Sequence, residues 1–514
     1  MKRLPLYLLV LLALALPARA VRGGEPLWSA PRAFEPSGWF PAIAADSTGR
    51  VHLFWSQSIY YGLNPDNPEA EPTSGYDVVY YTSSADGEEW ETANDILAIP
   101  QYSVRSVEVT RPNPWISPDG TLHLTYRNLD VFYSQAPVRE AANAQAWRLP
   151  VKLNLRNLGY FSAVTGDSRG YLHALYTENT PDSYCNLCYR LYYRQSPDNG
   201  TTWSIPIDLS ALAAQPVGAA KPQFLLDEEE NIHVVWEAGT GGTFGGVNDP
   251  VQILHTVSYD GGVTWSLLHQ ITLPEQQNAR NPALGLDAHN RLVLAWLNMD
   301  EDRPYYRLSV THGRSWETPK PIPGVWGERS IHNTRQSAFS MVRDSAGNLH
   351  LVMIGRLDPQ QSSLNILHII WDGKEWSQPE IIATYQEDVP EWPQAAIGLG
   401  NQLHVTWFVR AKDHIWDANP DFYTVFYSHR QVDAPALESV PLPSPTPTPT
   451  ATPTVTPTPR PTPPPSLRLS PIEPEQTRTI FTENDDLMVI AVSVFPVLIF
   501  FGGLLLFVRN KYRF

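Results

Sequence analysis

The chain has 514 residues and a formal net charge of −16, and 11% of its residues are aromatic. This acidic balance argues against a nucleic-acid-binding protein, which needs a basic face, and against electrostatic docking on an anionic membrane surface. We therefore expect no nucleic-acid partner.

The N-terminus carries the features of a secretory signal. A basic start, Met1 to Arg3, precedes an almost wholly apolar run from Leu4 to Leu16, and Ala18-Arg19-Ala20 supplies a small-residue cleavage site. Residues 1–20 are therefore predicted to be a cleaved signal peptide. The alternative is a retained N-terminal anchor, which fits less well because the apolar run is short for a bilayer span.

Two sequence patterns then recur along the chain. The first is a tryptophan followed by a short polar step and often a proline, and its copies, 51 to 62 residues apart, begin at Trp28, Trp90, Trp147, Trp203, Trp265, Trp316 and Trp376. The second is a turn followed by an apolar strand, with a central position occupied by His52, His123, His173, His233, Val293, His350 and His404. A repeat of this length indicates one supersecondary unit per copy. We interpret the repeated histidine as a packing or hydrogen-bonding feature and expect no metal site.

Runs of β-branched and aromatic residues, such as Val78-Val79-Tyr80-Tyr81, lie between these patterns and are bounded by turn residues, which predicts roughly four strands per repeat. Four-stranded units repeated radially form a β-propeller. We predict an all-β fold for residues 25–436, a single propeller of seven four-stranded blades, with six blades and one degenerate unit as the alternative. The isolated step at Trp28 predicts that an N-terminal strand completes the last blade and closes the ring, leaving no open edge.

Two of the repeats contain a motif of the form Ser-x-Asp-x-Gly-x-Thr-Trp, and degenerate versions occur elsewhere. The defining residues of the two full copies are Ser196, Asp198, Gly200, Trp203, Ser258, Asp260, Gly262 and Trp265. In such a turn the Ser and Asp side chains bond the turn's own amides, and glycine takes the positive-φ position. In this motif the chain resembles the Asp-box, or bacterial neuraminidase repeat, proteins. The resemblance implies that the Asp-boxes join the outer two strands of a blade, away from the active site, so we expect them to be structural.

A binding site is expected at the mouth, the face on which the innermost strands begin and the second strands end. The predicted strand starts carry Phe40, Arg111, Phe161, Lys221, Arg280, Arg335 and Trp392, and the strand ends carry Gln57, Arg127, Glu178, Glu237, Asn298, Asp300, Arg356 and Arg410. Arginine binds a carboxylate in a bidentate fork, so this set suits a carboxylated or polyhydroxylated sugar. The ligand-binding candidates are Arg111, Glu178, Lys221, Glu237, Arg280, Arg335, Arg356, Trp392 and Arg410. The alternative is that these residues pair with one another at a solvated rim.

The resemblance also bears on catalysis. Sialidases use an arginine triad, an acid/base aspartate and a tyrosine nucleophile activated by a glutamate, and the candidate counterparts here are Arg111, Arg280, Arg335 and Glu237. The family's Phe-Arg-Ile-Pro motif is replaced by Trp39-Phe40-Pro41-Ala42, and Tyr385 is the one candidate nucleophile. We therefore favour a non-catalytic propeller that binds an extracellular glycan or protein. The alternatives are a sialidase or related glycoside hydrolase, and a structural surface protein.

Two loops carry further predictions. Cys185 and Cys188 are predicted to form a small disulfide loop, because an extracellular setting is oxidising. The glycine-rich stretch Gly239–Pro250 is predicted to be a mobile flap over the mouth. It does not follow a phosphate-loop pattern, so we expect no nucleotide and no other cofactor.

The C-terminal part predicts a tethered protein. Residues 437–484 are expected to form an extracellular stalk, because proline and threonine dominate from Pro441 to Pro465 and favour extended polyproline II. Residues 487–508 contain no charge and predict a transmembrane helix. The basic residues that follow predict a cytoplasmic tail, 509–514, and a head outside the cell. We expect a single-pass protein of the cell membrane with an extracellular N-terminal head.

Overall fold

The structure is a computed structural model that describes residues 27–62, 72–101, 108, 110–156, 158–181, 187–213, 218–242, 246–329, 336–415 and 420–443. The predicted signal peptide, Cys185, Arg335, most of the predicted stalk, the predicted membrane span and the tail lie outside these residues. The chain divides into a unit of residues 1–446 and a unit of residues 447–514, and every described residue belongs to the first. Within the described ranges the only helices are single 3₁₀ turns of three residues, and none of them could cross a bilayer.

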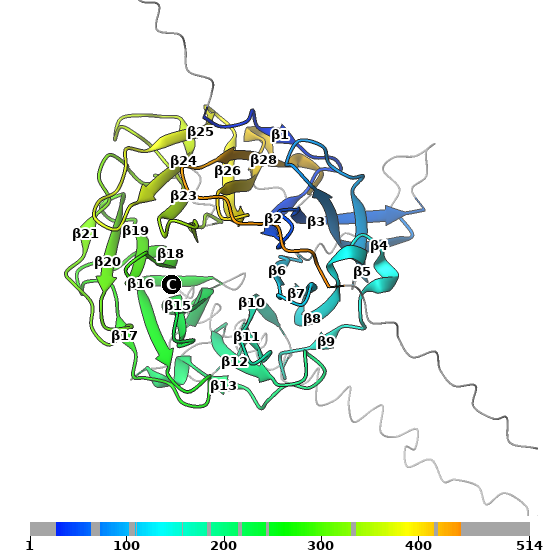
Figure 1. The fold of residues 1–514 in the computed structure, drawn as a ribbon, viewed down its shortest axis with the longest axis horizontal. Coiled ribbons are helices and arrows are strands. Elements are labelled where there is room, and N and C mark those ends of the chain that lie inside the picture. Colours follow the sequence, from blue (N-terminus) through cyan, green and yellow to red (C-terminus); the bar gives the residue numbers. More distant parts are fainter. Residues whose placement is uncertain are drawn as a thin grey trace, which may run out of the picture. The chain divides into compact units, whose positions relative to one another are not determined.

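The described unit is a ring of seven antiparallel sheets with four strands each (Figure 1), which confirms the predicted seven blades and excludes six. Innermost strand first, blades 1 to 3 are β2 (Trp39–Ala45), β3 (Val51–Tyr61), β4 (Ser74–Ser84), β5 (Asn94–Pro100); β6 (Asn113–Ile116), β7 (Thr121–Asn128), β8 (Asp130–Pro137), β9 (Val151–Lys152); and β10 (Gly159–Gly166), β11 (Leu172–Asn179), β12 (Tyr189–Ser196), β13 (Ile207–Asp208).

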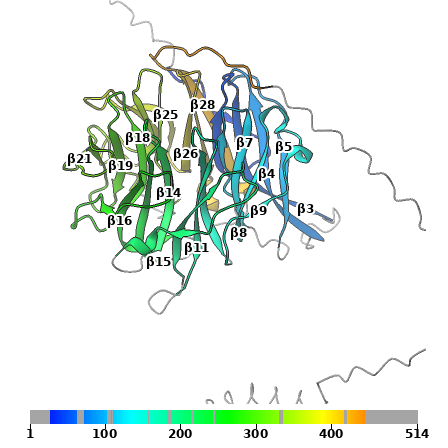
Figure 2. The ribbon, with the colours of Figure 1, turned by 60° about the horizontal axis from the view of Figure 1, so that its bottom comes forward.

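Blades 4 to 7 follow the same order. They are β14 (Gly218–Leu226), β15 (Ile232–Gly241), β16 (Val247–Ser258), β17 (His269–Gln270); β18 (Ala279–Leu286), β19 (Leu292–Asn298), β20 (Arg303–Ser309), β21 (Lys320–Pro321); β22 (Ser340–Arg343), β23 (Leu349–Gly355), β24 (Leu364–Trp371), β25 (Glu380–Tyr385); and β26 (Val389–Gly398), β27 (Gln402–Arg410), β28 (Tyr423–Gln431), β1 (Arg32–Ala33). The hairpins β3–β4 and β15–β16 are longer than their counterparts and extend beyond the ring on the mouth face (Figure 2).

The ring closes as the sequence predicts. β1, from the N-terminal segment, pairs antiparallel with β28 as the outer strand of blade 7. Two flanking bonds extend this pairing, since the Ser29 amide donates to the His429 carbonyl and the Phe34 amide to the Val425 carbonyl, both at 2.9 Å. Trp28 is buried, at 6% exposure, between blades 6 and 7, where it packs edge-on against the His368 ring of blade 6 at 5.3 Å between centroids.

The repeated histidine is a hydrogen-bonding element, as predicted. In blade 3, His173 is fully buried on β11, and its Nδ1 lies 2.7 Å from the Tyr193 hydroxyl on β12. Equivalent pairs join His52 to Tyr81, His123 to Tyr133, and His404 to Tyr427, with a second histidine in place of tyrosine in the pairs His233–His255 and His350–His368. In most blades an aspartate of the preceding turn lies beside the outer ring nitrogen, as Asp46 does at 3.3 Å from His52 Nε2. In blade 5 the position is Val293, which is buried by packing alone.

The turns with the Ser-x-Asp-x-Gly-x-Thr-Trp motif pack against the ring that pairs with the buried histidine of the preceding blade. In the blade 4 turn the Ser258 hydroxyl donates to Asp260 at 2.8 Å and accepts the Gly262 amide at 2.7 Å. Trp265, which ends the motif, packs edge-on against the Tyr193 ring of blade 3 at 4.9 Å between centroids. Trp203 packs in the same way on Tyr133 of blade 2, at 5.2 Å. At these junctions the tryptophan of one sequence pattern therefore packs on the tyrosine ring that pairs with the histidine of the other pattern.

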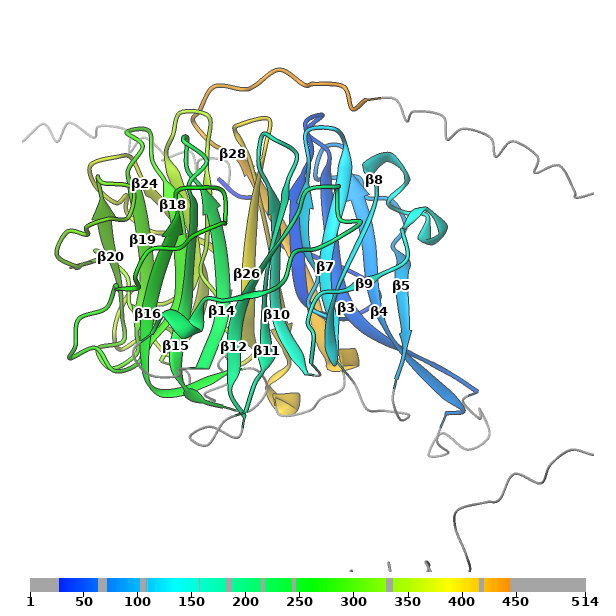
Figure 3. The same ribbon diagram turned by 90° about the horizontal axis from the view of Figure 1, so that it is seen from below.

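Residues 432–443 form a segment that we call the strap, which runs back over the propeller (Figure 3). The Leu437 amide donates to the Leu399 carbonyl of blade 7, and the Val440 amide to the Ser47 carbonyl of blade 1, both at 2.8 Å. Leu442, at 8% exposure, then packs into the core of blades 1 and 2. The propeller thus continues seven residues beyond the predicted boundary at 436, because Leu442 buries a large apolar side chain there. The strap lies on the face opposite the mouth, since Ser47 follows the far end of β2.

We expect the strap to stabilise the closed ring. Leu442→Ala should lower the free energy of unfolding by about 2 kcal/mol, the lower end for a buried leucine, because a terminal strap can peel off without opening the core. Val440→Ala is the matched control, because Val440 is 60% exposed and the hydrogen bond from its backbone amide to Ser47 is retained. Urea unfolding of the full-length protein measures both. Equal, negligible effects of the two changes would show that the strap contributes nothing.

Candidate ligand site at the mouth

A bulge repeated in the innermost strands shapes the mouth. In five blades one residue adopts a left-handed conformation directly before a proline, and these residues are Phe40, Arg111, Lys221, Asn281 and Trp392, with φ between 42° and 56°. The pairing with the second strand shifts at this point in blades 1, 4, 5 and 7. A bulge re-aims a side chain, and proline lacks the N–H that the interrupted ladder would otherwise leave unpaired. The bulge therefore turns these side chains toward one another across the ring.

At the centre, four aromatic rings surround the Arg111 guanidinium in an arrangement that we call the Arg111 cage. The guanidinium carbon lies 3.7 Å from the Phe40 ring centroid, 4.9 Å from that of Tyr160, and 5.2 Å from those of Phe161 and Trp392. Phe161 and Trp392 are parallel, at an interplanar angle of 10°. A guanidinium is attracted to aromatic faces, so three different blades hold this cation in place.

Arg111 has no ionic partner in the described structure. Its Nη2 donates to the Tyr160 hydroxyl at 3.2 Å and to Gln336 Oε1 at 3.1 Å, whereas its Nε and Nη1 are shielded from solvent and have no hydrogen-bond partner. The residue is only 7% exposed. Burial lowers the pKa of Arg111, and the charges of Arg127 and Arg410 act in the same direction. A buried cation with unpaired donors is costly, and a negatively charged ligand would offset that cost.

The other basic residues of the mouth are paired. Arg127 Nη2 lies 2.7 Å from Glu108, and Arg410 Nε lies 2.5 Å from Glu391. Arg356 binds Asp302. The partners of these three arginines are carboxylates that were not among the predicted mouth residues, and the arginines are buried rather than at a solvated rim.

Lys221 and Glu237 form a second buried group beside the cage. Lys221 Nζ lies 2.5 Å from Asn281 Oδ1, 2.7 Å from the Ser337 carbonyl and 3.2 Å from Glu237 Oε1. Burial alone would raise the pKa of Glu237, but the charges of Lys221 and Arg280 outweigh it and the pKa is lowered. Glu237 is thus an anion already neutralised within the protein.

Arg280, a predicted triad residue, anchors a hairpin. Its Nη2 lies 2.8 Å from Asp249, its Nη1 donates to the Val247 carbonyl at 2.9 Å, and its Nε donates to Asn278 at 2.9 Å. Most of the predicted flap is paired strand, because β15 runs to Gly241 and β16 begins at Val247. The position in blade 5 that matches Arg111 and Lys221 in conformation is Asn281, one residue later.

Glu328 is a carboxyl group of the mouth with a raised pKa. It is half-buried, and burial raises its pKa to about 7, which the charge of Lys221 opposes and the carboxylates of Glu391 and Asp302 reinforce. A carboxyl group of this pKa exchanges its proton near neutral pH, as a general acid or base must.

The remaining predicted residues lie apart from the cage. Glu178 accepts the backbone amides of Leu155 and Arg156, so it stabilises a loop. Tyr385 is on the outermost strand β25, accepts a hydrogen bond from Trp407 Nε1 at 2.8 Å, and has its pKa raised to about 12 by burial. These properties do not suit an activated nucleophile. Asn298 bonds Glu301 and the Asp300 amide, and Gln57 bonds Ser37.

Four residues of this site were not predicted from the sequence, namely Tyr160, Asn281, Gln336 and Glu328. A signal for one of them was present, since the repeated residue-proline step of the innermost strands marks Asn281-Pro282 as it marks Arg111-Pro112. The other three sit beside the bulges rather than on a repeated position, and no pattern in the sequence distinguishes them.

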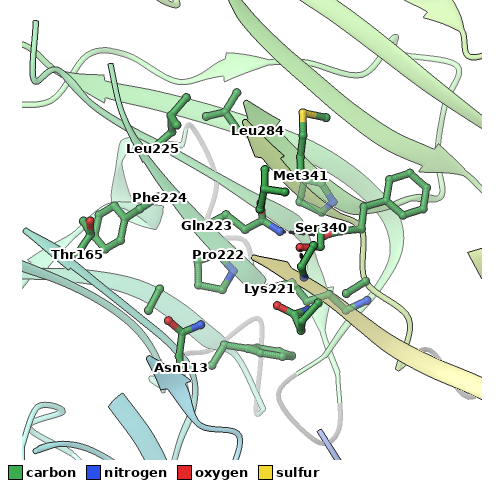
Figure 4. Close-up of a pocket in the computed structure, with 18 of the residues that line it drawn as sticks. Asn113, Thr165, Lys221, Pro222, Gln223, Phe224, Leu225, Leu284, Ser340 and Met341 are labelled. Atoms are coloured by element: carbon green, nitrogen blue, oxygen red, sulfur yellow. Dashed lines mark hydrogen bonds between the residues drawn. The ribbon is translucent and has the colours of Figure 1, made fainter. Parts of the chain in front are cut away.

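A cavity of about 490 Å³ is lined mainly by the innermost strands of blades 2 to 7 (Figure 4). Phe161, Lys221 and Trp392 belong to its lining, which mixes amide and hydroxyl groups with apolar side chains, among them Asn113, Gln223, Phe224, Ser340 and Met341. Because Phe161 and Trp392 belong both to the cage and to this lining, the cavity adjoins the cage.

No known family model matches the chain, and no curated protein matches its sequence. Solved structures do resemble it. A polysaccharide lyase of family PL25, an ulvan lyase bound to -[GlcA(1-4)Rha3S]-, is 12% identical over 74% of this chain and 92% of that one, with a TM-score of 0.47. The intramolecular trans-sialidase from Ruminococcus gnavus is 10% identical over 78% and 96%, with a TM-score of 0.42, and the Penicillium chrysogenum α-L-arabinanase complexed with arabinobiose is 13% identical over 79% and 96%, with a TM-score of 0.40.

The chain is a seven-bladed β-propeller. Similarity at this level of identity does not indicate an activity, and the residues of the mouth are the basis for inferring the function.

Proposed function

We propose that the protein binds an acidic glycan at the mouth of its propeller and does not cleave it. One observation carries this proposal: among the described residues Arg111 is a buried cation with two unpaired donor nitrogens and no carboxylate partner, in a mouth where Arg127, Arg280, Arg356 and Arg410 are all paired. A carboxylate or sulfate on a sugar supplies the missing charge.

The cage also suits the sugar ring itself. Aromatic faces present large apolar area at little entropic cost, and Trp392 is the cage residue that is partly exposed. Gln336 Oε1 is a neutral acceptor of the Arg111 Nη2 bond, on a half-buried side chain. A ligand carboxylate that replaces it would make a charge-assisted bond, which is roughly twice as strong as a neutral one.

The proposal includes the setting of the molecule. We infer that the chain is an Asp-box protein of the cell membrane, with residues 487–508 as its anchor and the head outside the cell. The position of Pro443, the last described residue, supports this arrangement, because the strap leaves the propeller on the face opposite the mouth. A tether attached there leaves the mouth open to extracellular ligands.

Glycan cleavage is the second candidate function, and Glu328 is the observation that favours it. A half-buried carboxyl group with a pKa of about 7 stands in the mouth near Lys221. Such a group can donate a proton to a leaving oxygen and later accept one from water.

The test is a glycan array probed with the full-length protein in detergent, with a fluorogenic sialoside assay in parallel. We expect retention on carboxylated or sulfated glycans, and about 10- to 150-fold weaker binding by Arg111→Asn, the value of one charged hydrogen bond. Asparagine tolerates the left-handed conformation of this position. Arg50→Gln is the control, since Arg50 pairs with Glu91 at the far ends of the strands.

Two outcomes would redirect the interpretation. Equal binding by Arg111→Asn and the wild type would show that the cage is not the site. Turnover of the sialoside that is lost in Glu328→Gln, with binding retained, would establish the second candidate function instead.

A further inference from the structure

The junction of blades 4 and 5 differs from its neighbours in how it neutralises a buried aspartate. In blade 3, Asp167 binds Arg169 of the same turn, and in blade 5, Asp287 binds Arg291, whose Nη2 lies 2.6 Å away. The corresponding turn of blade 4 reads Asp227-Glu228-Glu229-Glu230 and contains no arginine. Four carboxyl groups in succession therefore need positive charge from another part of the molecule.

His312, in the degenerate Asp-box of blade 5, lies beside two of these carboxyl groups. Its Nδ1 lies 3.0 Å from Asp227 Oδ2 and 3.3 Å from Glu229 Oε2. The three ligand atoms offered by these residues all lie within 4.8 Å of one another. His312 is held in place by its left-handed backbone, with φ 50°, and by the Tyr259 hydroxyl of blade 4, which donates to its carbonyl at 2.9 Å.

The surroundings orient both carboxylates. Asp227 Oδ2 also accepts from Asn231 Nδ2 at 2.8 Å and lies 3.2 Å from His233 Nε2. Asn290 Nδ2 contacts both oxygens of Glu229, at 3.2 and 3.3 Å. The other end of that amide, Asn290 Oδ1, is shielded from solvent and has no hydrogen-bond partner. Metal-binding carboxylates are characteristically held by such outer contacts.

From this arrangement we infer a binding site for a divalent transition cation, Zn²⁺ above all, with Asp227, Glu229 and His312 as ligands. Zinc bonds to nitrogen and oxygen of about 2.0–2.1 Å in tetrahedral geometry place neighbouring ligand atoms about 3.3 Å apart. The His312–Asp227 and His312–Glu229 separations of 3.0 and 3.3 Å fit that value. Ca²⁺ takes six to eight oxygen ligands and Mg²⁺ an octahedral oxygen shell, so one imidazole and two carboxylates suit neither.

The inferred ion would join two blades. Asp227 and Glu229 belong to the β14–β15 turn of blade 4, and His312 belongs to the turn after β20 of blade 5. Glu229 and His312 keep the site accessible, because their side chains are 54% and 29% exposed. The site lies at the far ends of the innermost strands, away from the mouth, and is independent of the proposed glycan function.

Zinc binding to the full-length protein, stripped of metal with a chelator, tests the inference. We expect one Zn²⁺ per chain by isothermal titration calorimetry, a rise in thermal unfolding temperature with Zn²⁺ but not with Mg²⁺, and a visible d–d absorption with Co²⁺. His312→Asn keeps the left-handed backbone and should weaken Zn²⁺ binding at least about tenfold, the effect of losing even an outer-shell partner. Glu229→Gln should do the same, and its exposed position makes misfolding no concern.

His289→Asn is the matched control. His289 is an exposed histidine at the position of the blade 5 turn that corresponds to Glu229, two residues after the buried aspartate. This variant should bind Zn²⁺ like the wild type. Absence of Zn²⁺ binding by the wild type, or unchanged binding by both His312→Asn and Glu229→Gln, would overturn the inference and leave a His312–carboxylate ion pair.

Discussion

Gly262→Ala is expected to lower the free energy of unfolding by about 3–5 kcal/mol, a large effect for the addition of one methyl group. Gly262 has φ 92°, where any side chain is strained by about 1–2 kcal/mol. In addition, a Cβ at this position would overlap the Tyr193 hydroxyl of the preceding blade. Tyr193 cannot move aside without losing its 2.7 Å bond to the buried His173. The loss of stability therefore comes from the contact between blades 3 and 4 as well as from the backbone strain of the turn.

Gly170→Ala separates the two contributions. Gly170 has φ 80°, and a Cβ there would meet no atom within 4 Å. It should cost only the strain of about 1–2 kcal/mol. Urea unfolding of both variants and of the double variant Gly262→Ala/Tyr193→Phe measures the difference, and removal of the hydroxyl should recover part of the loss through a non-additive coupling. Equal effects of Gly262→Ala and Gly170→Ala would mean that the close contact of Gly262 with Tyr193 adds nothing to the backbone strain.

The same junction explains why the fold was predictable from the sequence. Six of the seven blades have a buried His paired with a ring on β12 or its counterpart, and a motif Trp from the next blade packs on such a ring. Both residues therefore recur at similar spacings along the chain, which indicates the blade number and the closure by the N-terminal segment. The strap was not predictable in this way, because Leu442 follows no period and lies beside a proline-rich segment.

The candidate site was predictable only in outline. The sequence places arginines at the mouth, but whether each is free depends on partners from other strands and blades, such as Glu108 for Arg127 and Asp249 for Arg280. Arg111 differs from them because aromatic rings occupy the places where carboxylates would stand. Such pairing is a property of the assembled ring and leaves no mark on local spacing.

Acid is expected to destabilise the propeller strongly between pH 6.5 and 4. Burial lowers the pKa of His123 and of His368 to about 4, and that of His404 to about 3, and it lowers the pKa of His173 and His233 as well. In the unfolded chain these groups take up protons near pH 6.5. As the pH falls, the unfolded state therefore binds protons first, and stability is lost.

The magnitude follows from the width of that window. Each histidine whose folded pKa is 4 or lower costs about 2 kcal/mol of stability by pH 5, at 1.36 kcal/mol per pH unit. Four described carboxyl groups act in the opposite direction, because burial raises the pKa of Asp77 to about 6 and that of Glu328 to about 7, and it raises the pKa of Glu178 and Asp208 as well. These groups bind protons in the folded state first, and Asp77 and Glu328 return about 1–3 kcal/mol each over the same range. The histidines outnumber them, so the net effect is a loss of several kcal/mol.

His123→Gln tests the source of this loss. The variant should be less stable than the wild type at pH 7.5, because it changes the 2.7 Å contact with the Tyr133 hydroxyl. Its stability should nevertheless fall less steeply with acid, by up to one proton, or about 1.4 kcal/mol per pH unit near pH 5. Urea unfolding of the full-length protein at half-unit steps from pH 7.5 to 4.5 gives both slopes. Parallel curves for the two proteins would show that the buried histidine of blade 2 takes no part in the acid sensitivity.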